Sequence, residues 1–183
     1  MWEIEVKVRA KNLEDIAQKL SEAGCALSAP LHQYDTIYSY GESTSEWETS
    51  KEGHIVMRIR RENDRAEFNL KQQRSNELDN LEYETEVNDP QAMQKILLTL
   101  GYRPQVEVKK VRRKTKYGEY EICLDEVERL GAFVEIEKLA EDDADPKEAQ
   151  EELMKTLESL GLKREDQEMR GYDTQIFQLE HRI

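Results

Sequence analysis

Acidic and basic side chains alternate with apolar ones at the start of the chain, in the run Glu3-Ile4-Glu5-Val6-Lys7. Side chains alternate between the two faces of a β-strand, so Glu3, Glu5 and Lys7 share one face. Two carboxylates beside an ammonium group can hold a cation and an anion in one site. A half-exposed strand with a solvated charged face gives the same pattern, so this run alone leaves both interpretations open.

The acidic alternation recurs at Glu82-Tyr83-Glu84 and at Glu135-Ile136-Glu137. Each acidic strand precedes a predicted amphipathic helix with an Asn or Asp N-cap at its start and a glycine just past its end. The N-caps are Asn12, Asp89 and Asp145, and the glycines are Gly24, Gly101 and Gly161. A solvated face has no reason to recur in that context. With the recurrence, a functional set of acidic strands and a set of solvated faces are equally favoured.

Basic side chains form a second set on other predicted strands. Arg58 and Arg60 share a face, and Lys71 ends the following strand. Arginine binds phosphate oxygens through a bidentate fork and lysine supplies a point charge, while Mg²⁺ or Mn²⁺ takes carboxylate and phosphate oxygens together. Acidic and basic strands facing one another would therefore suit a polyphosphate with a divalent cation.

The face of the basic run after Val106 is ambiguous. Either Lys110 pairs with Arg112, or Lys109 pairs with Arg113. If Val106 and Val108 set the phase, Lys110 and Arg112 lie on their face. We therefore expect one charged interior that contains Arg58, Arg60, Lys71, Lys110 and Arg112.

The elements that must position these residues are mostly strands. The β-prone runs predict strands near 2–8, 33–40, 54–61, 65–72, 82–87, 105–116, 119–125 and 132–137. Hairpins join most of them, polar segments at 41–53 and 73–80 are predicted loops, and an antiparallel sheet of this size usually curls or closes. We predict an α+β fold in one domain, 1–183: an about eight-stranded antiparallel β-barrel with helices packed outside.

Composition narrows the function classes. The chain has 183 residues, 37% of them charged, and a formal net charge of −13, which argues against general nucleic-acid binding and against anionic membranes. We find no transmembrane run or signal peptide and expect a cytoplasmic protein. Cys25 and Cys123 lack metal-ligand spacing and are predicted to be reduced thiols, and the histidines lie far apart. Glycine-rich phosphate-binding motifs are also absent, so side chains would have to hold a triphosphate.

The chain resembles the CYTH family, the triphosphate tunnel metalloenzymes, over essentially all of its length. The anchor of the resemblance is the N-terminal Glu-x-Glu-x-Lys run, and further motifs follow in the order typical of the family. They are Asp35-Thr36-Ile37-Tyr38, Arg58-Ile59-Arg60, Leu70-Lys71, Glu82-x-Glu84, the Val-x-Lys-x-Arg run of Val108, Lys110 and Arg112, Leu124-Asp125, and Leu130 to Glu137.

This resemblance implies a barrel that forms a tunnel, with a triphosphate and Mg²⁺ or Mn²⁺ inside. It also implies residue roles. The metal would lie on Glu3, Glu5, Glu135 and Glu137, the triphosphate on Arg58, Arg60, Lys71, Lys110 and Arg112, catalysis on Lys7, Asp125 and Arg112, and further tunnel carboxylates would be Glu82 and Glu84.

The length and the run Gly131 to Glu137 look most like the class IV adenylyl cyclase branch, which converts ATP to cyclic AMP and pyrophosphate. A triphosphatase that hydrolyses inorganic, thiamine or nucleoside triphosphate is the first alternative. A non-catalytic module that binds nucleotide or polyphosphate is the second. In each case we expect a small-molecule triphosphate such as ATP as partner, no nucleic acid, no membrane, and a possible homodimer.

Overall fold

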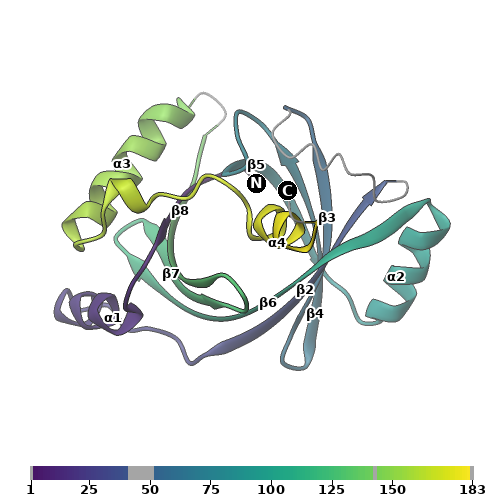
Figure 1. Ribbon diagram of the computed structural model, residues 1–183, viewed down its shortest axis with the longest axis horizontal. Helices are drawn as coiled ribbons and strands as arrows, with labels where there is room; N and C mark the ends of the chain where they lie inside the picture. The colour runs from purple at the N-terminus through teal and green to yellow at the C-terminus, as the bar shows by residue number, and fades with distance from the viewer. Residues whose placement is uncertain (1, 41–51, 142–143, 182–183) are drawn as a thin grey trace.

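The computed structural model describes residues 2–40, 52–141 and 144–181. Eight antiparallel strands close into a barrel in the order β1-β5-β4-β3-β2-β6-β7-β8 (Figure 1). Their bounds are β1 Trp2–Arg9, β2 Leu31–Tyr40, β3 Ile55–Glu62, β4 Arg65–Gln73, β5 Asp79–Glu86, β6 Tyr102–Tyr117, β7 Tyr120–Val127 and β8 Gly131–Leu139. The predicted α+β barrel is confirmed. Of the two predicted loops, 41–51 lies outside the described residues, and the second is shorter than predicted because β5 begins at Asp79.

The three predicted helices follow the acidic strands: α1 (Leu13–Glu22), α2 (Pro90–Thr99) and α3 (Pro146–Ser159). Each begins at its predicted N-cap, whose side chain accepts a backbone hydrogen bond from the first turn. The glycines after the helices have φ values of 82° at Gly24, 94° at Gly101 and 89° at Gly161, in the left-handed region. Local sequence chemistry therefore fixes where each helix starts and stops.

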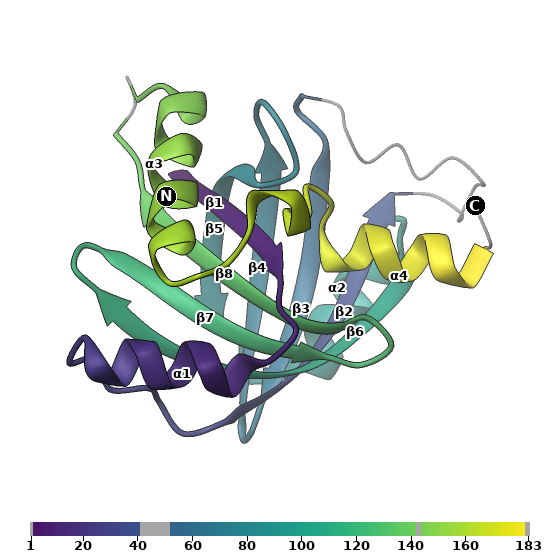
Figure 2. The same ribbon diagram turned by 60° about the vertical axis from the view of Figure 1, so that its left-hand side comes forward.

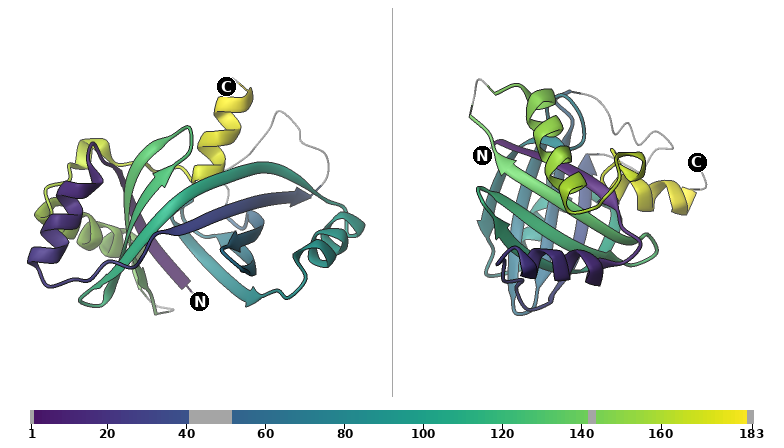
Figure 3. Two further views of the ribbon diagram at one scale, coloured as in Figure 1. Left: turned by 90° about the horizontal axis from the view of Figure 1, so that it is seen from below. Right: turned by 90° about the vertical axis from the view of Figure 1, so that its left-hand side faces the viewer.

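The apolar core lies between the barrel and these helices. The outward side chains of β1, Ile4, Val6 and Val8, belong to one cluster with buried residues of α1 and α3, including Leu157. On the opposite side, Leu97 of α2 packs with Tyr38 and Ile59. Figures 2 and 3 show α1 and α3 on one side of the barrel and α2 on the other. Because these two clusters lie on the outer face, much of the inner face is free to hold charged groups.

A fourth helix, α4 (Tyr172–His181), was not predicted and follows a short 3₁₀ turn at Arg164–Asp166. It lies within the ring of strands when the barrel is viewed end-on (Figure 1). Its residues Ile176 and Phe177 pack in one cluster with Ile37 and Val108, which line the barrel interior. Unlike α1, α2 and α3, α4 therefore covers one end of the barrel. Within the described residues, no helix has the length and apolar content that crossing a membrane requires.

Candidate active site

The barrel encloses a cavity of about 360 Å³ that side chains from all eight strands line. It brings together every predicted site residue except Asp125: Glu3, Glu5, Lys7, Arg58, Arg60, Lys71, Glu82, Glu84, Lys110, Arg112, Glu135 and Glu137. Asp125 is fully buried behind the cavity wall and contacts Lys110 and Arg112 from there. The interior is therefore a charged chamber assembled from residues far apart in the sequence.

Strand β6 places Lys110 and Arg112 on the inner face. Lys109 lies outside, with its Nζ 5.2 Å from the centre of the Tyr34 ring, and Arg113 forms a 3.7 Å ion pair with Glu14 of α1. This placement agrees with the phase set by Val106 and Val108.

Three carboxyls form the acidic part of the chamber: Glu3, Glu5 and Glu137. Glu5 stands directly opposite Glu137 in the pairing of β1 with β8, and like charges in that position repel. Burial, followed by nearby carboxylates, raises the pKa of Glu3 to about 8 and that of Glu5 to about 7. Burial and Glu135 also raise the pKa of Glu137. Lys71 opposes the pKa shift at Glu3, Lys7 and Lys71 oppose it at Glu5, and Arg112 opposes it at Glu137. These cations do not cancel the upward pKa shifts.

Next to this acidic part, Lys71 of β4 forms an ion pair with Glu82 of β5. Burial alone would raise the pKa of Glu82, but Lys71 and Arg58 lower it to about 2. The Asn69 amide donates hydrogen bonds to Glu82 at 2.9 Å and to Glu84 at 3.0 Å. Glu82 is thus held as a carboxylate, and its charge fixes the position of Lys71.

The basic part contains three arginines, which are held by two aspartates on neighbouring strands. Arg60 donates from Nε and Nη2 to the two oxygens of Asp35, both at 2.8 Å, and Arg58 lies 3.7 Å from the same carboxylate. Burial would raise the pKa of Asp35, but Arg60 and Arg58 hold it well below its usual range. Each bound guanidinium still has N–H groups left for a phosphate.

Arg112 of β6 is held in the same way by Asp125 of the neighbouring strand β7. Its Nε donates to Asp125 at 2.7 Å, and Lys110 Nζ donates to the same residue at 3.3 Å. Arg112 also pairs with Glu135. Burial would raise the pKa of Glu135, but Arg112 and Lys110 lower it well below its usual range. Of the four glutamates predicted to bind metal, Glu135 is the one that pairs with the basic part, and the metal-binding role of the set stays a prediction.

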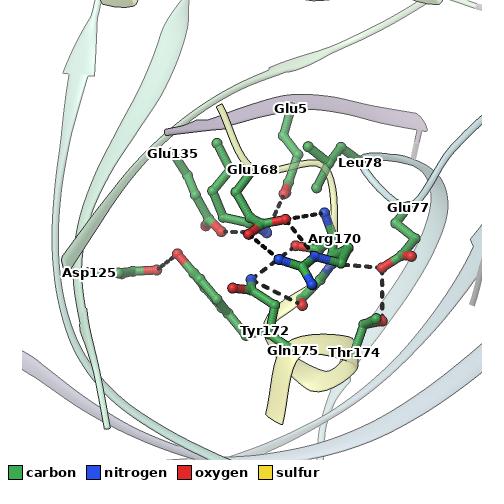
Figure 4. A network of polar contacts seen from close by, with 12 residues as sticks. Glu5, Glu77, Leu78, Asp125, Glu135, Glu168, Arg170, Tyr172, Thr174 and Gln175 are labelled. Atoms are coloured by element: carbon green, nitrogen blue, oxygen red, sulfur yellow. Dashed lines mark hydrogen bonds and ion pairs between the residues drawn. The ribbon is translucent and has the colours of Figure 1, made fainter. Parts of the chain in front are cut away.

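Lys7 lies where the two parts meet. Its Nζ is 3.8 Å from Glu5 and 3.7 Å from Glu135, and its side chain is 1% exposed. The ring of Tyr172, from the start of α4, faces this ammonium group with its centre 4.4 Å away, and the Tyr172 hydroxyl donates to Asp125 at 3.1 Å (Figure 4).

Glu3, Glu5 and Glu137 suit a hard divalent cation by charge and by donor type. Among the described residues, however, no group of three or more Asp, Glu, His or Cys side chains is assembled as a complete metal site. Phosphate oxygens of a bound substrate would have to complete the coordination, as is usual for Mg²⁺.

Sequence analysis did not assign site roles to Asp35, Asn69 or Tyr172. A carboxylate inside the aromatic, β-prone run at Asp35 is a signal that could have identified the first. Nothing in the local sequence marks Tyr172, because its position depends on how α4 meets the barrel.

A closed barrel that lines its interior with carboxylates, arginines and lysines defines a class of protein suited to a polyanion with a cation. The chain belongs to one such family, that of the CYTH domain, whose match covers residues 1–172.

Relatives that match almost the whole chain agree with this assignment. A Methanocaldococcus jannaschii protein named "Putative adenylate cyclase" is 27% identical over 168 residues, which cover 91% of this chain and 93% of the relative. The structure of the PH1819 protein of Pyrococcus horikoshii has a TM-score of 0.78 at 29% identity and covers 98% of this chain and 99% of its own. The PH1012 protein of the same organism has a TM-score of 0.78 at 28% identity, with 94% and 98% covered.

Proposed function

We propose that this protein is a metal-dependent enzyme that acts on a triphosphate, with the conversion of ATP to cyclic AMP and pyrophosphate as the first candidate reaction. One observation carries the proposal. Inside the barrel, carboxyls with raised pKa values, Glu3, Glu5 and Glu137, lie beside basic side chains of the kind that binds phosphate: Arg58, Arg60, Lys110 and Arg112.

In this proposal, Glu3, Glu5 and Glu137 hold Mg²⁺ or Mn²⁺, which supplies positive charge against the phosphates when bound. Glu135 contributes mainly by fixing Arg112 and Lys7. The arginines bind phosphate oxygens through N–H groups that Asp35 and Asp125 leave free, and Lys7, Lys71 and Lys110 add point charges. Because these groups are already paired and positioned, little reorganisation accompanies the reaction.

The cyclase reaction is supported by the name of the curated relative, which covers nearly the same length. In that reaction the ribose 3′-oxygen forms a bond to the α-phosphorus, pyrophosphate leaves, and the 3′-hydroxyl proton must be accepted by a base. The predicted catalytic roles of Lys7, Asp125 and Arg112 stay predictions. Both oxygens of Asp125 accept hydrogen bonds from Arg112. Asp125 is therefore better suited to holding that arginine than to accepting the proton.

Hydrolysis of a triphosphate is the second candidate, and one observation favours it. Among the described residues that line the cavity, Tyr172 and His54 are the ones with aromatic rings, and the ring of Tyr172 faces Lys7 and Lys110. Because the Tyr172 ring is engaged by these lysines, His54 is the one other described ring at the cavity that could stack on a nucleobase, whereas attack of water on a γ-phosphate needs no base-binding site. A non-catalytic module that binds polyphosphate is the remaining alternative.

Product analysis separates these functions. The protein would be incubated with ATP, inorganic tripolyphosphate or thiamine triphosphate plus Mg²⁺ or Mn²⁺. Cyclic AMP with pyrophosphate would identify a cyclase, orthophosphate a triphosphatase, and saturable binding without turnover a binding module.

Two controls make the result specific. EDTA should abolish turnover and added metal should restore it, whereas full activity in EDTA would contradict the metal assignment. The Glu5→Gln variant, purified in parallel, should be much less active, which excludes a contaminating phosphatase. The cytoplasmic location, the lack of a nucleic-acid partner and the possible homodimer stay predictions.

A further inference from the structure

Helix α4 meets the charged chamber at its first residue, Tyr172, which is also the last residue of the family match. Tyr172 is only 8% exposed and packs edge-to-face against Phe133, with ring centres 5.1 Å apart. The first residue of α4 is therefore part of the chamber wall, and the rest of the helix covers the barrel end.

The ring of Tyr172 faces two ammonium groups. Lys7 Nζ lies 4.4 Å and Lys110 Nζ 4.9 Å from the ring centre, both within cation–π range. The nearest carboxylate oxygens to Lys7 are at 3.7 and 3.8 Å, beyond ordinary hydrogen-bond length. Since ion pairs alone hold Lys7 loosely, the ring is the group that fixes where this ammonium points.

The position of Tyr172 is itself fixed by the barrel. The Glu77 carboxylate, in the connection before β5, accepts hydrogen bonds from the Gly171 N–H at 2.7 Å and from the Thr174 hydroxyl at 2.8 Å (Figure 4). The Glu168 N–H donates to the backbone oxygen of Lys7 at 2.9 Å. The segment that carries Tyr172 is thus attached on both sides of the ring, once to the strand of Lys7 itself.

We propose that Tyr172 is a positioning residue, which holds the ammonium groups of Lys7 and Lys110 toward a bound triphosphate through its ring. This inference rests on the proposed function. It makes the docking of α4 a condition for full affinity.

The test compares Tyr172→Leu, which removes the ring, with Tyr172→Phe, which keeps the ring and removes the hydroxyl. The substrate is whichever of ATP, tripolyphosphate or thiamine triphosphate the wild type turns over. We expect Tyr172→Leu to lower kcat/KM by roughly tenfold or more, mainly through a higher KM, and Tyr172→Phe to stay within about threefold of wild type. Ile176→Ala is the matched control, since Ile176 is a buried α4 residue of the same cluster that contacts apolar residues.

Thermal unfolding of each variant shows whether it folds, and Tyr172→Met, which retains a long apolar side chain, replaces the leucine variant if that variant is unfolded. A leucine or methionine variant no worse in KM than Ile176→Ala would overturn the proposal, because Tyr172 would then act only by packing. Equal losses in the leucine and phenylalanine variants would overturn the role of the ring. A wild type that neither binds nor turns over any triphosphate would overturn the proposed function and this inference together.

Discussion

The two faces of strand β1 differ in chemistry, although at Lys7 the inner face is nearly as hidden from water as the outer face. On the outer face Ile4, Val6 and Val8 are each 0% exposed and pack under α1 and α3. On the inner face Lys7 is 1% exposed, yet it is surrounded by carboxylates and an aromatic ring. Burial alone therefore does not identify the core of this protein.

The two faces also differ in what they contribute. Apolar burial on the outer face stabilises the fold, whereas buried charges on the inner face stabilise it little and cost free energy when one partner is lost. We therefore expect substitutions outside the barrel to change stability, and substitutions inside to change binding and turnover. The predictions below test that division, from the largest expected effect to the smallest.

The largest effect is expected outside the barrel, for truncation of a buried helix residue. Leu97→Ala or Leu157→Ala should lower the free energy of unfolding by about 2–5 kcal/mol, because each leaves a cavity between helix and sheet. The neighbouring Leu98 is 37% exposed, so Leu98→Ala should cost much less. Chemical denaturation gives the stabilities, and turnover per folded molecule should stay near wild type. A stable but inactive Leu97→Ala would show that α2 contributes to the site.

Inside the barrel, Arg112→Ala should lower kcat/KM. The loss of transition-state stabilisation should be about 2–4 kcal/mol, the scale of a lost electrostatic donor. Arg112→Lys tests the same position with less disturbance, because it keeps the charge and loses the bidentate fork. Steady-state kinetics on folded protein would measure both. Wild-type kcat/KM in both variants would contradict the phosphate-binding role of the chamber.

The acidic part should make stability depend on pH and metal together. The pKa values of Glu3 (about 8) and Glu5 (about 7) are raised in the folded state, so the metal-free folded protein keeps protons that the unfolded chain has released. Its stability should therefore fall as pH rises from about 4.5 to about 8. A divalent cation binds the ionised carboxylates, so Mg²⁺ should raise the Tm by on the order of 5 °C at pH 8.5 and by little at pH 5.5.

Two variants separate this effect from general salt stabilisation. Glu5→Gln should remove most of the Mg²⁺-dependent rise in Tm at pH 8.5. Glu126→Gln, on the exposed side of β7, should leave it unchanged. An equal response in both variants would argue against a cation site at Glu5.

The smallest effect is expected for Arg113→Ala, one residue from Arg112 on the outer face. Its 3.7 Å ion pair with Glu14 is solvent-exposed and should contribute about 0–1 kcal/mol to stability. Because Arg113 lies outside the chamber, activity should stay within about twofold of wild type by the same kinetic assay, a change below 1 kcal/mol. A loss comparable to that of Arg112→Ala would mean that the inner and outer faces of β6 are not functionally distinct.

Some of the site could be predicted because its signals are local. Strand alternation has a period of two residues, so the shared face of Glu3, Glu5 and Lys7 follows from the run itself. The closed barrel turns that face inward. For Lys110 and Arg112, the phase followed from Val106 and Val108. The helix boundaries followed from Asn12, Asp89 and Asp145, whose side chains cap the backbone beside them.

Helix α4 could not be predicted in this way. The Gly171 N–H, just before the helix, donates to Glu77, a residue 94 positions earlier in the chain. The group that caps the start of α4 is therefore not in the adjacent sequence. The position of Tyr172 in the chamber depends on the same long-range contact. Without the folded barrel, neither the helix start nor the ring position is specified.

By itself, the sequence determined the eight strands, the outer helices and which charged residues share a strand face, because each depends on neighbours within a few positions. Only the tertiary structure decided which charges meet. Barrel closure sets Glu5 opposite Glu137 and lets Arg112 pair with Glu135, so glutamates that are alike in sequence acquire opposite pKa shifts. The physical reason is that strand phase is a local property of the backbone, whereas register, closure and charge pairing depend on residues that lie far apart along the chain.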